Sequence, residues 1–185
     1  MTRRFVYVMG PSGAGKNSVL QYARAALDGS QPIAFAHRYI TREPGGDIEN
    51  FISLSPGEFA LRRSRGLFAY HWAAYGMHYG IGIEIDAWRQ AGLVVVIDGS
   101  RAHFIANMDS LANTVPVLIT ADVSTLRNRL RARGRDDAPA IELRVRRATE
   151  LSPEHPSLLV IDNSGSLETA GEAMTALLRR AAAGA

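Results

Sequence analysis

Cysteine is absent from this chain of 185 residues, so neither a disulfide nor a thiolate metal site can form. Long apolar runs are also absent, because no stretch approaches the roughly 20 consecutive apolar residues that a membrane-spanning helix needs. Nothing in the composition is typical of a secreted protein, and we expect a soluble protein of the cytoplasm. Hydrophobic residues make up 46% of the chain and charged residues 21%, which are ordinary values for one globular domain with a full core.

Lysine is almost absent. It occurs once, at Lys16, whereas arginine supplies the other 20 of the 21 cationic side chains. A general preference for arginine does not explain why the one lysine lies in a glycine-rich segment, but a need for a compact ammonium that reaches phosphate oxygens does. The net charge is +3, yet the arginines are scattered among acids without an aromatic-basic stripe. We therefore expect a small acidic substrate, and no nucleic-acid or membrane partner.

Apolar runs and amphipathic segments alternate along the chain, which predicts an α/β fold with a mostly parallel sheet and helices on both faces. The expected strands cover residues 5–9, 32–35, 93–97, 115–119 and 158–161. The expected helices cover residues 15–27, 84–90, 101–111, 124–133, 141–151 and 167–180, followed by a frayed alanine-rich tail. Residues 37–83 show no clear period, and a connection of this length indicates a functional segment such as a binding subdomain or a lid.

A phosphate-binding loop is the strongest motif. Its residues are Gly10, Pro11, Ser12, Gly13, Ala14, Gly15 and Lys16, which fit G-x-x-x-x-G-K between an expected strand and an expected helix. The glycines let backbone N–H groups converge on phosphate oxygens, and the start of the helix adds partial positive charge. A glycine-rich turn without a ligand is the alternative, which the matching context disfavours.

The loop departs from the usual motif at one position. The residue after the lysine is normally a serine or threonine whose hydroxyl binds Mg²⁺, but here it is Asn17, followed by Ser18. The amide oxygen of Asn17 is a weaker ligand for a hard cation. Asn17 alternatively holds a metal-bound water or caps the chain locally.

Asp98 and several arginines are further candidates. Asp98 ends an apolar strand at the sheet edge expected for the phosphate loop, where a carboxylate holds Mg²⁺ through water or contacts the acceptor, and a helix N-cap is the alternative. Arg131 and Arg135 share one helix face, and Arg144 and Arg147 lie three apart on the next helix. Arginines on both sides of a Gly-Pro loop suit a lid over transferring phosphates, with plain surface charge as the alternative for each.

These segments together resemble the guanylate kinase fold family of P-loop kinases. The resemblance covers nearly the whole chain and rests on the phosphate loop, on Arg38-Tyr-Ile-Thr-Arg42, on Tyr79-Gly-Ile-Gly-Ile-Glu-Ile-Asp86 and on Asp98-Gly-Ser-Arg-Ala-His103. Within that fold family the chain is most similar to the ribose 1,5-bisphosphate phosphokinases of phosphonate use. The resemblance implies one kinase domain with a core of residues 1–36 and 84–185, an acceptor-binding region of about 37–83 and a lid of about 131–147.

The reaction implied by the resemblance is the ATP-dependent conversion of ribose 1,5-bisphosphate to 5-phosphoribosyl 1-diphosphate (PRPP), with ATP and Mg²⁺ as cofactors. Because the accepting phosphate oxygen is already anionic, no general base is needed. We expect Lys16, Arg131 and Arg144 to be catalytic, Arg38, Arg42, Tyr79, Asp98 and Arg101 to bind the acceptor, Arg135 and Asn163 to bind the nucleotide with residues 10–18, and Asn17 and Asp98 to hold the metal.

Two other functions stay open. The first is a GMP kinase, but guanylate kinases read guanine with a glutamate and a Thr/Ser where the resemblance places Tyr70 and Ile81, and loss of these polar groups disfavours a base. The second is a non-catalytic binding module of the same fold. Such modules usually degrade the phosphate loop, whereas Lys16 and the loop glycines remain here.

Overall fold

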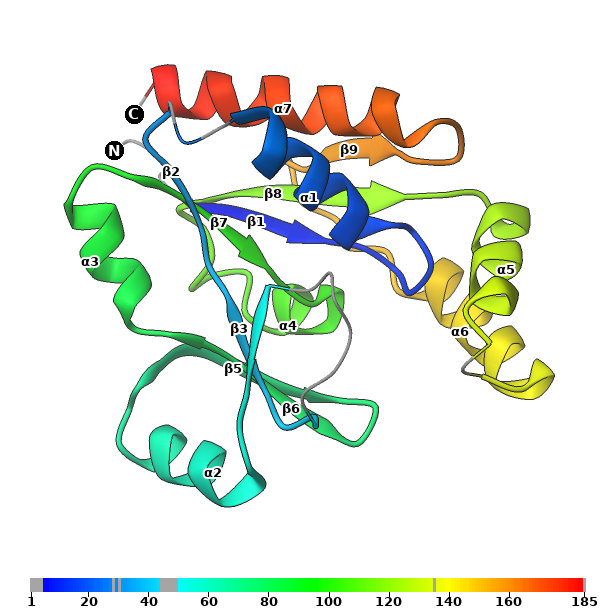
Figure 1. Ribbon diagram of the computed structural model, residues 1–185, viewed down its shortest axis with the longest axis horizontal. Helices are drawn as coiled ribbons and strands as arrows, with labels where there is room; N and C mark the ends of the chain where they lie inside the picture. The colour runs from blue at the N-terminus through cyan, green and yellow to red at the C-terminus, as the bar shows by residue number, and fades with distance from the viewer. Residues whose placement is uncertain (1–4, 28, 30, 44–49, 135, 185) are drawn as a thin grey trace.

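The computed structural model describes residues 5–27, 29, 31–43, 50–134 and 136–184. They form a five-stranded sheet with helices on both faces, a separate four-stranded sheet, and a pair of helices that projects from one end (Figure 1). Within these residues no helix is long and apolar enough to cross a membrane. The mostly parallel α/β architecture predicted from the sequence is confirmed.

The large sheet is entirely parallel. Its strands, in spatial order, are β2 (Ile33–Phe35), β7 (Val94–Asp98), β1 (Phe5–Met9), β8 (Thr114–Thr120) and β9 (Leu159–Asp162). Side chains alternate between its faces, so Val6 and Val8 enter one core while Tyr7 and Met9 enter the other. Burial on both faces explains the continuous apolar runs in the sequence.

Two pairs of helices cover this sheet. Helices α1 (Lys16–Leu27) and α7 (Leu167–Ala183) lie along one face, as Figure 1 shows, and α3 (Glu84–Gln90) and α4 (Arg101–Ala106) contribute Ile85 and Phe104 to the core of the other. Among the boundaries that differ from the prediction are the ends of α4 and α7. Helix α4 ends at Ala106 because the chain turns there and buries Leu111 from an irregular segment, and α7 continues to Ala183 because Ala181 and Ala182 pack against the core.

The second sheet belongs to a compact insertion, residues 38–82, which we call the small sheet unit. It contains β3 (Arg38–Ile40), β4 (Phe51–Ser53), α2 (Pro56–Ser64), β5 (Phe68–Ala74) and β6 (Met77–Gly82), with strand order β4–β3–β6–β5 and its own core of Leu54, Phe59 and Phe68. The irregular structure expected for residues 37–83 is therefore wrong. Two of its strands, β3 and β4, have only three residues and are too short to display an alternating pattern in sequence.

The projecting pair consists of α5 (Val123–Ala132) and α6 (Ala138–Glu150), which we call the arm. Asp122 and Asp137 cap the two helix starts by accepting hydrogen bonds from backbone N–H groups. Leu130, Ile141 and Val145 form a small core between the helices. This small core is separate from the two cores of the large sheet, but Leu126 and Ala148 also pack into one of those cores and fix the arm beyond the carboxyl ends of the strands (Figure 1).

Candidate active site

The phosphate loop lies between β1 and α1, and its shape requires glycine. Gly13 and Gly15 have φ angles of 90° and 78°, which L-amino acids with a side chain rarely adopt. A Cβ on Gly10 would lie 2.6 Å from the carbonyl oxygen of Ile119, and one on Gly15 would lie 2.4 Å from Nδ2 of Asn163. The glycines therefore serve both the backbone conformation and a close approach of neighbouring segments.

Two side chains donate hydrogen bonds to the backbone of the loop. Asn163 is 2% exposed and donates a 2.7 Å hydrogen bond from Nδ2 to the carbonyl oxygen of Ala14, and Arg129 donates to the same oxygen at 3.4 Å. The sequence predicts nucleotide binding for Asn163, and the structure places its amide against the loop backbone. The contact of Arg129 was missed, because in sequence it is one of five arginines at alternate positions.

A cluster of three charges lies at the mouth of the loop. The ammonium of Lys16 pairs with Oδ1 of Asp98, and a guanidinium nitrogen of Arg38 lies 3.2 Å from Oδ2 of the same carboxylate. The three side chains are only 12–13% exposed. Removal of either partner from such a pair strands the other charge away from water. The fold thus brings together residues predicted from three separate segments, and two cations against one carboxylate leave the cluster net positive.

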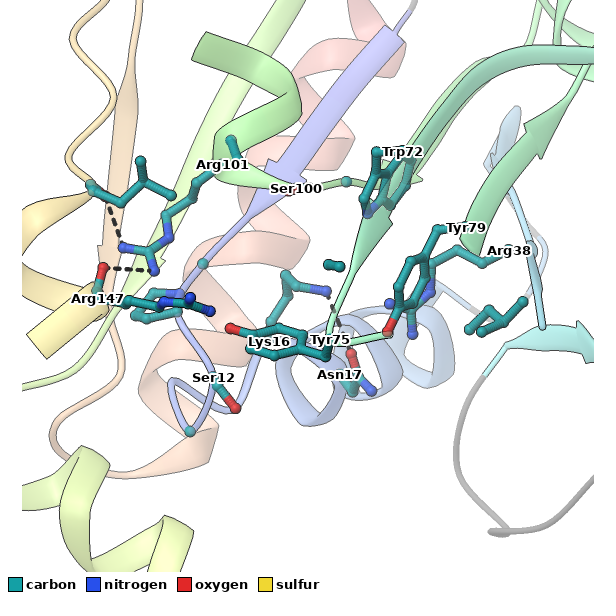
Figure 2. Close-up of a pocket in the computed structure, with 18 of the residues that line it drawn as sticks. Ser12, Lys16, Asn17, Arg38, Trp72, Tyr75, Tyr79, Ser100, Arg101 and Arg147 are labelled. Carbon is teal, nitrogen blue, oxygen red and sulfur yellow. Dashed lines mark hydrogen bonds between the residues drawn. The ribbon is translucent and has the colours of Figure 1, made fainter. Parts of the chain in front are cut away.

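A cavity of about 550 Å³ opens above this cluster. Figure 2 shows its walls, with Arg101 and Arg147 on one side and Trp72, Tyr79 and Arg38 on the other. Among the described residues that line it are six cationic side chains and one carboxylate: Lys16, Arg38, Arg42, Arg101, Arg133, Arg147 and Glu150. Such a lining suits a polyanionic ligand.

The turn that follows Asp98 is fixed by Tyr7, a residue that the sequence did not single out. The hydroxyl of Tyr7 accepts a hydrogen bond from the backbone N–H of Ser100 at 3.1 Å and lies 3.0 Å from Nδ1 of His103. A Cβ on Gly99 would lie 2.1 Å from the tyrosine ring, so only glycine fits there. Burial raises the pKa of Tyr7 and lowers the pKa of His103, which keeps both groups neutral at pH 7.

Arg101 leads from this turn to the arm. The sequence predicts that it binds the acceptor, but its guanidinium donates to three carbonyl oxygens at the end of α6, those of Ala148 at 2.9 Å, Leu151 at 2.7 Å and Arg147 at 3.2 Å. Burial lowers the pKa of Arg101 and the nearby Tyr75 opposes that shift. A guanidinium at the negative end of a helix is a favourable C-cap, so the observed contacts are those of a residue that positions the arm.

The arm arginines divide into groups. Arg144 reaches the phosphate loop, where it donates to Oγ of Ser12 at 3.2 Å while pairing with Asp136 at 3.0 Å. Arg131 is exposed and is not among the residues that line the cavity, whereas Arg133 lines it. The prediction for Arg135 lies outside the described residues. On α1, Ser18 is exposed and Asn17 lines the cavity.

Comparison with curated proteins finds several relatives over almost the full chain. Ribose 1,5-bisphosphate phosphokinase PhnN from Desulfomicrobium baculatum is 47% identical over 175 residues, which cover 95% of this chain and 94% of that protein. The enzyme of the same name from Burkholderia pseudomallei is 48% identical over 176 residues, or 95% of each chain. This chain belongs to the PhnN family. The resemblance stated from the sequence is therefore confirmed, and the chain is a kinase.

The fold of this PhnN family member is shared with guanylate kinase. The solved structure of guanylate kinase from Anaplasma phagocytophilum matches with a TM-score of 0.61 over 96% of this chain and 86% of that chain, at 16% identity. No family model matches the sequence. The two kinds of comparison thus agree on the P-loop kinase fold, and within that fold the curated relatives identify the PhnN family.

A metal site built from protein ligands alone does not fit the part of the chain that the structure describes. The described residues contain no group of three His, Cys, Asp or Glu side chains that could hold an ion. Of the two predicted ligands, Asp98 already faces Lys16 and Arg38, and Asn17 offers a neutral amide oxygen 3.5 Å from the lysine ammonium. This sparse donor set fits a cation that arrives already bound to nucleotide phosphates and keeps several waters.

Proposed function

We propose that this kinase transfers the γ-phosphoryl group of ATP to the 1-phosphate of ribose 1,5-bisphosphate and produces PRPP, as in phosphonate catabolism. The names of its relatives support this reaction. The observation that carries it at the site is the positive cluster of Lys16, Arg38 and Asp98 beside a cavity lined by six cationic side chains and a single carboxylate. A site of this kind neutralises two polyanions at once.

Four cationic side chains have a role in the proposed transfer: Lys16, Arg38, Arg42 and Arg144. An oxygen of the 1-phosphate attacks the γ-phosphorus of ATP, the bond from that phosphorus to the bridging oxygen breaks, and ADP leaves. Loop N–H groups and Lys16 hold the donor phosphates. Arg38 and Arg42 orient the acceptor phosphate and offset the repulsion between it and the donor phosphates. Arg144, at the loop, stabilises charge on the transferring group. Because the attacking oxygen carries no proton at neutral pH, no side chain has to act as a base.

Asn17 and Asp98 are the residues beside which Mg²⁺ would bind. When bound, the ion neutralises phosphate charge and orients the nucleotide. In the present arrangement Asp98 holds the two cations in place, and an arriving phosphate offers both of them alternative partners. We therefore assign Asp98 chiefly to the organisation of Lys16 and Arg38, and Asn17 to the metal or its waters.

The small sheet unit and the arm complete the proposal as acceptor-binding unit and lid. Tyr79 stacks on Trp72 with ring centroids 5.6 Å apart and planes 3° from parallel, which makes a flat wall beside Arg38. Ile81 is fully buried in a core cluster, and Tyr70 packs against that cluster. Neither residue lines the cavity, so neither is placed to read a nucleobase there, which favours a sugar phosphate over GMP.

An acceptor screen tests this function. ADP release is measured with ribose 1,5-bisphosphate or GMP as acceptor, and the product is identified by its use in a PRPP-dependent phosphoribosyl transfer. We expect turnover with the sugar bisphosphate, and Lys16→Ala should lower kcat by at least about 100-fold in a protein that is still folded. Efficient phosphorylation of GMP without turnover of the sugar bisphosphate would contradict the proposal. Failure of the chain to bind ATP would favour a non-catalytic module.

A further inference from the structure

The tip of the β5–β6 hairpin carries a residue that its backbone disfavours. Tyr75 and Gly76 form a two-residue connection between the paired residues Ala74 and Met77, and their φ angles are 51° and 74°. Two positive φ angles in a two-residue hairpin define a type I′ turn, whose first position favours Asn, Asp or Gly. A Cβ makes this conformation unfavourable, and tyrosine adds no local hydrogen bond that would offset the strain. Tyr75 is the only non-glycine residue with positive φ in the part of the chain that the structure describes.

The side chain of Tyr75 points at the arm. The guanidinium carbon of Arg144 lies 4.5 Å from the centroid of its ring, and that of Arg147 lies 5.9 Å away. Arg144 is the arginine that donates to Ser12 of the phosphate loop. The ring is 52% exposed, and Tyr75 lines the cavity (Figure 2). The hairpin of the small sheet unit, helix α6 and the phosphate loop therefore meet through Tyr75 and Arg144.

An aromatic ring suits this contact better than a carboxylate would. The negative face of a ring attracts a guanidinium without cancelling its charge, and it leaves the N–H groups free to donate to oxygen atoms. Arg144 has a second partner on the arm itself, Asp136, at 3.0 Å. The ring of Tyr75, the carboxylate of Asp136 and the hydroxyl of Ser12 thus contact the guanidinium of Arg144 together, and only the ring comes from the small sheet unit.

We propose that Tyr75 is a positioning residue that couples the small sheet unit to the arm, so that the contact with its ring holds Arg144 toward the phosphate loop. The strained turn is retained because the residues that favour this turn position, Asn, Asp and Gly, offer no aromatic face. The inference rests on the proposed transfer reaction, in which Arg144 stabilises the transferring group. Tyr75 acts through Arg144 and is not itself placed on a reacting atom.

Three variants test it. Tyr75→Asn removes the ring and relaxes the turn, so we expect the melting temperature to rise by about 2–4 °C while kcat falls about fivefold. Tyr75→Phe keeps the ring and should retain the wild-type kcat and melting temperature. Tyr75→Leu keeps both bulk and strain without a π face, and its kcat should fall like that of Tyr75→Asn without a gain in stability. The acceptor KM should change less than twofold in all three.

A double-mutant cycle with Arg144→Gln shows whether Tyr75 works through Arg144. In the Arg144→Gln background, Tyr75→Asn should have no further effect on kcat. An unchanged kcat in Tyr75→Asn, an equal loss in Tyr75→Phe, or additive losses in the cycle would each overturn the proposal. A raised acceptor KM with unchanged kcat would make Tyr75 a substrate ligand and overturn it as well.

Failure of the proposed reaction can be distinguished from failure of the role proposed for Tyr75. If the wild-type protein does not turn over ribose 1,5-bisphosphate, the affinity for a non-hydrolysable ATP analogue replaces kcat as the readout. It is measured by calorimetry in the presence of Mg²⁺. Because Arg144 borders the nucleotide phosphates, that affinity should fall severalfold in Tyr75→Asn and Tyr75→Leu and be retained in Tyr75→Phe. Equal nucleotide affinity in all variants would then overturn the role of Tyr75 independently of the acceptor.

Discussion

Replacement of Arg101 by methionine distinguishes a positioning role from the acceptor-binding role that the sequence predicts. Methionine keeps an unbranched stem but donates no hydrogen bond, so Arg101→Met removes all three bonds to the end of α6. A hydrogen bond from a charged donor is worth about 1.5–3 kcal/mol, and water recovers part of the loss at this helix end. We therefore expect a net loss of about 3 kcal/mol in the free energy of unfolding.

The assay combines differential scanning calorimetry with full kinetics in both substrates. For a chain of this length, 3 kcal/mol corresponds to a fall of roughly 6–12 °C in melting temperature. We expect kcat to fall as well, because a displaced arm carries Arg144 away from the loop. Arg146→Met is the matched control, since Arg146 is exposed on α6, the helix that Arg101 contacts, and should change stability by less than about 0.5 kcal/mol. An unchanged melting temperature with a raised acceptor KM would refute the reasoning and make Arg101 a ligand of the acceptor.

Three further changes probe the loop, the acceptor site and a half-buried histidine. Gly15→Ala places a Cβ against Asn163 at a φ of 78°, so nucleotide affinity and melting temperature should both fall. Calorimetry with an ATP analogue measures the nucleotide affinity, and a wild-type value would show that the loop adapts. Arg42→Ala should raise the acceptor KM roughly 10- to 100-fold and leave the ATP KM within about threefold, and equal effects on both would exclude acceptor binding. Burial lowers the pKa of His103, so the unfolded chain binds a proton more readily than the folded one. Stability should therefore fall as the pH drops below the ordinary value of 6.5 and through the lower folded pKa, a fall that His103→Gln should reduce in urea titrations at pH 5 and 7.

The sequence predicted most of what depends on a local pattern. The order of strands and helices in the large sheet follows from apolar periodicity, and the phosphate loop follows from a motif in a strand–helix context. Because parallel strands end at one sheet edge, the proximity of Lys16 and Asp98 also follows from the sequence, and their pairing is observed.

What the sequence did not predict depends on distance and direction. Arg101, Arg131 and Arg144 have the same chemistry and similar contexts in sequence, yet one caps a helix, one faces solvent and one reaches Ser12. Asn163 and Arg129 meet Ala14 across more than a hundred residues of chain, which no local pattern records. One local signal was overlooked: an aromatic residue before glycine at the centre of a hairpin, where Asn-Gly is usual, marks Tyr75.

The distribution of charge bears on the choice of substrate. The whole chain carries a net charge of +3, while the described cavity lining alone combines six cations with one carboxylate. The rest of the chain therefore carries a slight excess of acid, and the basic character of the protein is concentrated where phosphates would bind. A nucleic-acid-binding surface would instead spread its cations over an exposed face or groove.

The single lysine fits the same argument. At the cavity walls, arginine offers a planar fork of donors that matches phosphate oxygens in pairs, which explains its use at positions 38, 42, 133 and 147. At position 16 the cation stands at the first residue of α1, is 12% exposed, and has to approach both Asp98 and Asn17 from one atom. A point charge on a flexible stem satisfies that geometry, whereas a guanidinium would project its fork beyond the carboxylate and into the space of the phosphates. Lys16→Arg should therefore lose most activity even though the charge is retained, and wild-type turnover in that variant would show that charge alone decides this position.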